Sequence, residues 1–128
     1  MLSRFEPHVY ALLRIVTGLL FVFHGLQKFG MFGGRVVDLM SRPGAAALIE
    51  TAGGSLVMIG LFAAPVAFVC SGEMAAAYFL SHAPQAFWPI QNRGELAVLF
   101  CFVFLYIAAR GSGTWSIDWL RGKKGKRR

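Results

Sequence analysis

Two long apolar runs constrain this chain more than any other feature of its sequence. Residues 9–29 form the first run, which is long enough for the roughly 20 residues that a helix needs to cross a bilayer. The second run, residues 45–82, is nearly twice that length, so it must fold back on itself. We place the break at residues 62–65, because proline suits the first turn of a helix and disrupts its middle. The sequence therefore predicts spans over residues 9–29, 45–61 and 65–82, the last two as an antiparallel hairpin.

A fourth apolar run, residues 95–109, follows a polar loop. That loop, residues 83–94, holds two prolines and Trp88, a ring type that favours the membrane interface. Gly111 and Gly113 end the fourth span. The composition agrees with a membrane protein, because 56% of the residues are hydrophobic and only 15% are charged, against roughly 25% charged in soluble domains. We therefore expect an all-α integral membrane protein, folded as an antiparallel four-helix transmembrane bundle.

The net charge of +7 is concentrated in the C-terminal tail. Six of the thirteen basic residues lie from Arg121 onward and the rest of the chain is about neutral, so we expect no nucleic-acid partner. Eight Lys and Arg residues lie on the side of the two termini and four on the opposite side, which places both termini in the cytoplasm by the positive-inside rule. We divide the chain into a four-helix transmembrane domain, residues 1–120, and a basic cytoplasmic tail, residues 121–128. The tail is expected to rest on anionic lipid, and docking of a partner protein is the alternative.

Several ionisable residues lie at membrane depth, where each costs about 2.5 to 3.5 kcal/mol to insert and is a functional candidate. His24 and Lys28 share one helical stripe of the first span. Glu50 lies on a stripe of small residues in the second span, and Glu73 lies near the middle of the third. In the antiparallel arrangement these groups converge in the outer half of the bundle. Arg14 is the exception, because it lies nearer the cytoplasmic end, where we expect it to snorkel.

Small residues and helical periodicity indicate which helix faces meet. Gly72 and Ala76 form a small-xxx-small pair, which predicts a close-packed seam beside Glu73. The fourth span sets four residues in line on one helical face: Glu95, Leu99, Phe102 and Tyr106.

Plainer interpretations compete with a site for several of these residues. A lone histidine such as His24 is more often a satisfied interior residue, Lys28 could snorkel outward, and Glu95 suits water at the boundary equally well. Arg42 looks like a solvated loop charge. Glu50 and Glu73 are harder to dismiss, because a short carboxylate side chain cannot snorkel far and needs a cation, a proton or water. The candidate ligand-binding residues are therefore His24, Lys28, Glu50, Glu73, Glu95 and Tyr106.

A metal centre and acyl-transfer chemistry are not expected. Di-iron bundles carry Glu-x-x-His motifs on two helices, and this sequence has none. Cys70 and Cys101 lie in apolar runs without the spacing of a zinc site or a disulfide framework. No serine or cysteine has a base at a recognisable spacing. We therefore assign no catalytic residue.

Several short segments of the chain form a recognisable combination. They are Arg14, His24-Gly25-Leu26-Gln27-Lys28-Phe29, Glu50 with Gly53-Gly54, Gly72-Glu73-Met74-Ala75, Asn92-Arg93-Gly94-Glu95-Leu96-Ala97-Val98 and Gly111-Ser112-Gly113-Thr114-Trp115-Ser116-Ile117-Asp118. With these segments the chain resembles the DoxX family of small four-helix bacterial membrane proteins, over about residues 9–119. Arg93 departs from the family pattern, which often has a glycine there. The resemblance implies the bacterial cytoplasmic membrane and an association with redox metabolism, since some relatives are linked to thiosulfate:quinone oxidoreduction.

The first functional hypothesis is a membrane component of a redox system, which binds a quinone or another small redox-active molecule in the outer half of the bundle. His24 and Lys28 would hydrogen-bond an oxygen of the ligand, and Glu50 and Glu73 would relay protons. The apolar part of the ligand would be lined by Phe21, Phe102 and Tyr106.

Two other functions stay open. A scaffold or assembly subunit without an active site would use the buried ions to fix helix register. A small-solute transporter would line a pathway with the same polar groups and would need access from both faces. The redox hypothesis implies a membrane or peripheral redox protein as partner, and the apolar outer surfaces suit a homodimer. Whether the protein is itself an oxidoreductase is left open.

Overall fold

The computed structural model of the chain describes residues 1–125 and is all-helical over that range. α1 (Glu6–Gln27) follows a short 3-10 turn (Ser3–Phe5). The predicted basic tail covers residues 121–128, of which 126–128 lie outside the described residues. The tail begins inside α7 (Ile117–Gly125), so its first residues continue a helix.

The chain forms four long helical segments, here called rods, of which α1 is the first and α6 (Glu95–Arg110) the fourth. The second and third rods change their backbone hydrogen-bonding pattern along their length. The second rod consists of α2 (Arg42–Leu48), the π-helical turn η2 (Ile49–Gly53) and α3 (Gly54–Ile59). The third consists of α4 (Ala63–Ala77) and the π-helical turn η3 (Tyr78–His82). The short α5 (Pro89–Asn92) leads into α6 (Glu95–Arg110).

The long apolar run breaks where proline predicts it. Gly60 ends α3 in the left-handed conformation, with φ of 71°, and Phe62 is also left-handed before α4 begins at Ala63. Pro65 then lies in the first turn of α4, where its missing N–H has no helical acceptor to lose. The hairpin between the second and third rods therefore follows from local backbone chemistry.

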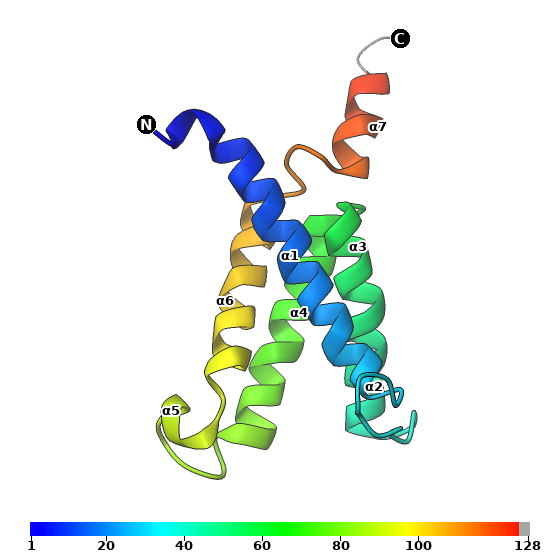
Figure 1. The fold of residues 1–128 in the computed structure, drawn as a ribbon, viewed down its shortest axis with the longest axis vertical. Coiled ribbons are helices and arrows are strands. Elements are labelled where there is room, and N and C mark those ends of the chain that lie inside the picture. The colour runs from blue at the N-terminus through cyan, green and yellow to red at the C-terminus, as the bar shows by residue number, and fades with distance from the viewer. Residues whose placement is uncertain (126–128) are drawn as a thin grey trace.

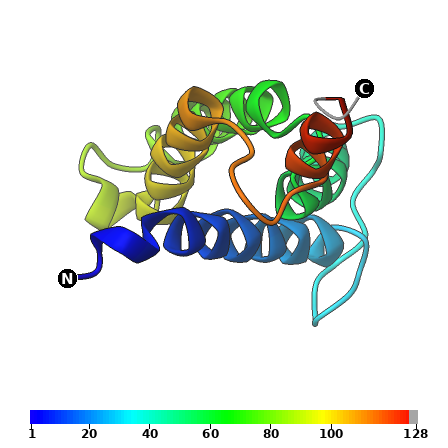
Figure 2. The same ribbon diagram turned by 90° about the horizontal axis from the view of Figure 1, so that it is seen from above.

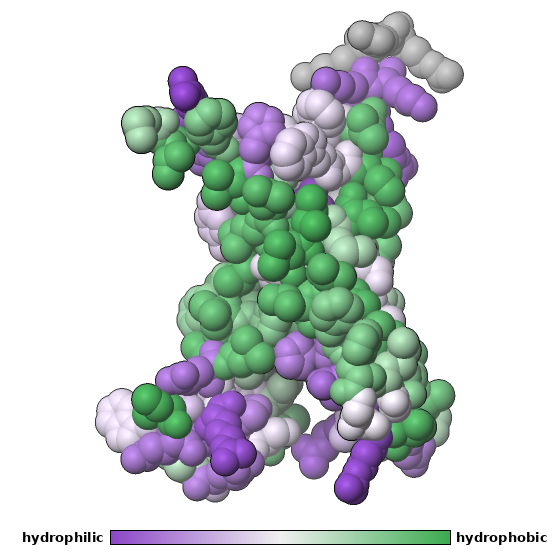
Figure 3. Space-filling view, viewed as in Figure 1, coloured by the Kyte–Doolittle hydropathy of each residue, from purple (hydrophilic) through white to green (hydrophobic). Residues whose placement is uncertain are grey.

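Two helices are long and apolar enough to cross a membrane: Ser3–Gln27, with 25 residues, and Ala63–His82, with 20 residues. α6 is shorter, at 16 residues, and the second rod does not meet the same criterion of length and apolar composition. On the face seen in Figure 3, hydrophobic side chains form a broad band that hydrophilic ends flank above and below. The membrane character of the chain is therefore visible in the structure, and the four-span bundle stays a prediction.

The rods pack as two pairs that diverge toward one end (Figure 1). α1 packs against α3, and α4 packs against α6. The N-terminus and α7 lie at one end of the molecule, here called the end that carries the termini, and α2 and α5 lie at the other. Seen from above, α1 runs along one side of the other helices (Figure 2). The α1 and α3 backbones touch at Gly18 and Gly54, since a Cβ on Gly18 would lie 2.6 Å from the Gly54 carbonyl oxygen.

An aromatic core joins the two pairs. The Phe21 ring of α1 lies 4.6 Å from the Phe104 ring and 5.4 Å from the Phe100 ring, both on α6. All three side chains are buried. Edge-to-face and tilted packing of this kind adds to the stabilisation from burial of apolar area. The two helix pairs therefore contact each other at these rings and diverge toward the end that holds α2 and α5.

The expectation that Arg14 snorkels to the cytoplasmic side is wrong. Its side chain is fully buried, and Nη1 donates to the carbonyls of Val57 and Met58 at 2.8 and 2.6 Å. Nη2 donates to the carbonyls of Thr114 and Trp115 at 3.3 and 2.7 Å. The last carbonyls of a helix have no intrahelical donor, so the guanidinium satisfies the end of α3 and the α6–α7 connection together.

The predicted packing faces of α4 and α6 are also wrong. A Cβ on Gly72 would meet nothing within 4 Å, so the expected seam at Gly72 and Ala76 is open surface. α4 instead packs with the face that holds Ser71, whose hydroxyl donates to the Cys101 carbonyl at 2.8 Å. The buried residues of α6 are not those predicted to face the site, but Ala97, Phe100, Phe104 and Ile107.

Candidate functional site

A cavity of about 640 Å³ lies between the diverging rods, at the end opposite the termini. Its volume falls within the range of small-molecule sites, about 300–1,000 Å³. The lining comes from every long rod. Phe21 and His24 lie on α1, Lys28 directly follows it, and Leu96, Ala97 and Phe100 lie on α6. Six residues between positions 42 and 50 of the second rod and seven between positions 73 and 82 of the third also line the cavity, as does Arg93.

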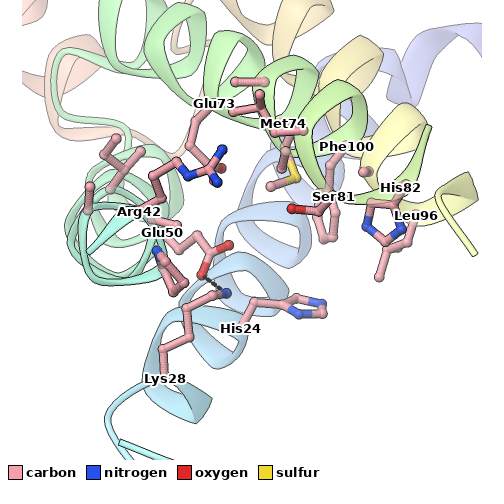
Figure 4. Close-up of a pocket in the computed structure, with 18 of the residues that line it drawn as sticks. His24, Lys28, Arg42, Glu50, Glu73, Met74, Ser81, His82, Leu96 and Phe100 are labelled. Carbon is pink, nitrogen blue, oxygen red and sulfur yellow. Dashed lines mark hydrogen bonds and ion pairs between the residues drawn. The ribbon is translucent and has the colours of Figure 1, made fainter. Parts of the chain in front are cut away.

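The strongest polar contact in the cavity joins α1 to the second rod. Lys28 Nζ donates to Glu50 Oε2 at 2.6 Å (Figure 4). The Glu50 side chain is only 4% exposed and the Lys28 side chain is 28% exposed. Glu50 lies in η2, and π turns of this kind occur frequently at functional sites. The ion pair gives the buried carboxylate the cation that its position demands.

Glu73 reaches the same cavity from α4 without such a partner. Its Oε2 atom is buried and has no hydrogen-bond partner among residues 1–125. Figure 4 shows Arg42 extending its guanidinium into the cavity between Glu73 and Glu50. Within the described part of the chain, Arg42 forms no ion pair or side-chain hydrogen bond. Arg93 also lines the cavity without an ion pair in the described residues, so the lining holds one satisfied carboxylate, one unsatisfied carboxylate atom and two unpaired cations.

The remaining wall is aromatic and apolar. Phe21, Met74 and Phe100 line the cavity beside His24, whose ring meets the Phe100 ring edge-on with centroids 5.8 Å apart. His82 faces the cavity from η3 while its Nδ1 lies 3.0 Å from the Asn92 carbonyl oxygen. A flat ring with polar oxygens would find both an apolar surface and hydrogen-bonding groups here.

The structure brings together four of the predicted residues and leaves two outside. His24, Lys28, Glu50 and Glu73 line the cavity, as the convergence argument predicts. Glu95 is exposed in the first turn of α6 and does not line it.

Tyr106 lies toward the other end of α6, 49% exposed, where its hydroxyl accepts from Arg110 Nη1 at 3.3 Å. Phe102, predicted to line the apolar part, is 63% exposed. Because α6 is apolar on every side, its few polar residues gave a false indication of the inward face, which Phe100 occupies.

Arg42 is the residue that the sequence argument missed. It looks like a loop charge, but the Ser41 side chain caps α2 by accepting from the Gly44 amide at 3.2 Å, so the helix begins at Arg42. Ser41 followed by proline in the first helical turn is a sequence signature of a helix N-terminus. That signal would have moved Arg42 from the loop to the first turn of a cavity-lining helix.

One family model matches this chain. The DoxX family model matches residues 9–83. An uncharacterized protein of Haemophilus influenzae is 39% identical over 127 residues, which covers 91% of this chain and 93% of that protein. No solved structure matches the chain. The matched region includes α1 and the whole second and third rods, with Lys28, Glu50 and Glu73. By the extent of both matches, and in agreement with its two long apolar helices, the chain is a membrane protein that belongs to the DoxX family.

Proposed function

We propose that the protein crosses the bacterial cytoplasmic membrane four times as an antiparallel bundle, with both termini in the cytoplasm. The hydrophobic band and the placement of the N-terminus and α7 at one end support this topology. α7 then lies at the cytoplasmic surface, where its exposed Arg121, Lys123 and Lys124 contact anionic lipid. Lys123 Nζ lies 3.7 Å from the centre of the Trp119 ring, a pairing suited to the headgroup region. In this topology the cavity faces the outer half of the membrane.

We further propose that the protein is a membrane component of a redox system and binds a quinone-like molecule in this cavity. The observation that carries the proposal is the buried Glu73 Oε2 atom without a partner, beside an apolar wall and a second carboxylate already paired with Lys28. An unsatisfied buried polar atom costs about 1 to 3 kcal/mol. A hydroquinone hydroxyl that donates to the Glu73 carboxylate, or a quinone oxygen that accepts from the protonated carboxyl, would remove that cost.

The residues of the cavity can orient the ligand and transfer protons, and the electrons for its reduction come from another molecule. Reduction of a quinone to a hydroquinone takes up two electrons and two protons. His24 and Lys28 can donate hydrogen bonds to quinone oxygens. Glu73 can deliver one proton as general acid, and Glu50, paired with Lys28, can relay the second from outside the cavity. A membrane or peripheral redox protein would provide the electrons as partner.

The test compares two Glu→Gln variants in lipid nanodiscs. A dimethoxybenzoquinone is bound to the protein and reduced by a soluble donor of electrons alone, reduced methyl viologen, and proton uptake is followed with a pH dye. Glu73→Gln should slow proton-coupled reduction about hundredfold, the typical contribution of a general acid. Glu95→Gln, the same change outside the cavity, should leave the rate unchanged. A wild-type protein that binds no quinone would overturn the proposal.

A scaffold function is the second candidate, and Arg14 is the observation that favours it. Arg14 shows that this fold uses a buried ion for structure alone, since its four hydrogen bonds all go to backbone carbonyls. If the polar residues of the cavity serve the same purpose, Glu73→Gln should leave cross-linked partner complexes intact. Deletion of residues 121–128 should then abolish those complexes. A transporter is less well supported, because Arg14 and the aromatic core close the opposite end.

A further inference from the structure

A second, apolar cavity adjoins the candidate site on its side toward the end that carries the termini. It has a volume of about 270 Å³ and lies between the second and third rods. Ile49 lines both cavities, so the two adjoin at this residue. We call this second cavity the groove. It is lined by six residues, none of them charged: Ile49, Gly53, Pro65, Val66, Val69 and Cys70.

The groove runs away from the polar groups along the direction of α4. On α4 the polar cavity begins at Glu73, and the groove occupies residues 65–70, toward the end that carries the termini. Val69 lies about 6 Å deeper than Glu73, at 1.5 Å of helix rise per residue. Val69 is 55% exposed, so the groove is open along the lipid-facing side of the bundle.

We propose that the ligand of the polar cavity is an amphiphile whose apolar chain lies in this groove, between the second and third rods. This inference rests on the proposed function, and it adds that the ligand enters laterally from the lipid. With the cavity in the outer half of the membrane, the head faces outward and the chain points to the bilayer centre. Lipids of the outer leaflet have the same orientation, so the ligand moves sideways into the site without turning over.

The groove is better suited to a linear chain than to a second polar molecule. Without a hydrophobic effect between apolar groups in lipid, binding of the chain depends on shape and close contact. Gly53 and Cys70 form the floor of the groove, since a Cβ on Gly53 would lie 2.6 Å from Cys70 Sγ. A side chain larger than valine at position 69 would fill the groove and leave the polar cavity unchanged.

The experiment uses two dimethoxybenzoquinones that differ only in one side chain, which is methyl in one and decyl in the other. Binding to the wild type, Val69→Trp and Phe68→Trp is measured in identical nanodiscs from the shift in the thermal unfolding midpoint followed by circular dichroism. Phe68 is the matched control, because it is 65% exposed on the same helix and lines neither cavity. Partitioning of the decyl quinone into lipid is equal for all three proteins and cancels in the comparison.

Val69→Trp should weaken binding of the decyl quinone about tenfold, because the indole ring would displace the chain from its close contacts with the groove. Binding of the methyl quinone should stay the same in all three proteins. Equal binding of the decyl quinone by the wild type and Val69→Trp, with the methyl quinone still bound, would overturn the groove assignment alone. Failure of the wild type to bind either quinone would overturn the proposed function, and this inference with it.

A phospholipid acyl chain is the competing occupant, and native mass spectrometry separates the two. The proposal predicts that the decyl quinone displaces any phospholipid retained by the wild type. Retained phospholipid that is lost in Val69→Trp, but that the decyl quinone does not displace, would assign the groove to bulk lipid and contradict the proposal.

Discussion

Lys28, which directly follows α1, and Glu50 of η2 form an ion pair in the wall of the cavity, with 2.6 Å between Nζ and Oε2. The pair links the first two rods where they diverge from the third rod and α6. The two partners are unequal, since the Glu50 side chain is 4% exposed and that of Lys28 is 28% exposed. Loss of one partner should therefore differ in cost from loss of the other.

Lys28→Met should destabilise the fold by about 3 kcal/mol, because it leaves the buried Glu50 carboxylate without a cation. Glu50→Gln should cost less, since the Lys28 ammonium can turn toward water. Replacing both residues with methionine should recover most of the stability. Unfolding in mixed micelles by titration with dodecyl sulfate measures all three. A Lys28→Met variant within about 0.5 kcal/mol of the wild type would show that the ion pair does not stabilise the fold.

Substitution of the buried Arg14 should destabilise the fold more than substitution of any other charged residue at the end that carries the termini. Arg14→Met removes four hydrogen bonds to backbone carbonyls, and each bond to a charged group contributes about 1.5 to 3 kcal/mol. We expect a loss of at least about 3 kcal/mol and faster proteolysis between α6 and α7. Arg4→Met, at an exposed arginine of the same end, is the control and should change neither.

Asp118 should make the α6–α7 connection sensitive to acid. Burial raises the pKa of this carboxyl, but hydrogen bonds from Ser112 Oγ and from the Phe62 and Ala63 amides outweigh it, so the pKa is lowered from its usual value of 3.8. A lowered folded-state pKa contributes stability above the unfolded-state pKa, and that stability is lost as the pH falls through the folded-state value.

The unfolding midpoint of the wild type should therefore fall as the pH drops below about 4. Asp118→Asn should be less stable at neutral pH and should show a weaker decline in the same acid range. Thermal scans between neutral pH and about pH 3 measure both. Parallel curves for the two proteins would mean that the Asp118 hydrogen bonds contribute no stability.

The four-span topology can be tested with single cysteines in a background that lacks Cys70 and Cys101. Arg35→Cys, in the connection between α1 and α2, should react with a membrane-impermeant maleimide in intact spheroplasts. Leu2→Cys and Gly122→Cys should react only after permeabilisation. If Arg35→Cys and Gly122→Cys label from the same side, the proposed topology is wrong.

The rods, their main break and the gathering of polar groups could be predicted from the sequence, because each depends on local rules. Apolar run length sets the rods, Pro65 sets the start of α4, and antiparallel connections bring Lys28, Glu50 and Glu73 to one end. These rules need no knowledge of how helices rotate about their axes.

The side of each helix that faces inward, and the long-range contacts to backbone carbonyls, could not be predicted in this way. α6 is apolar on all sides, so its periodicity does not distinguish the face of Phe100 from the face of Phe102. The acceptors of Arg14 lie at Val57 and about a hundred residues along the chain, at Trp115. Such contacts arise from the folding of the connection after α6, which no local pattern encodes.

Photolabelling with an azidoquinone tests the central claim most directly, because it reports where the ligand lies. Mass spectrometry of labelled wild-type protein should find adducts on cavity residues of three rods, Phe21, Met74 and Phe100, and excess unlabelled quinone should abolish them. Adducts confined to exposed side chains such as Phe68 and Leu99, and unaffected by competition, would contradict the account.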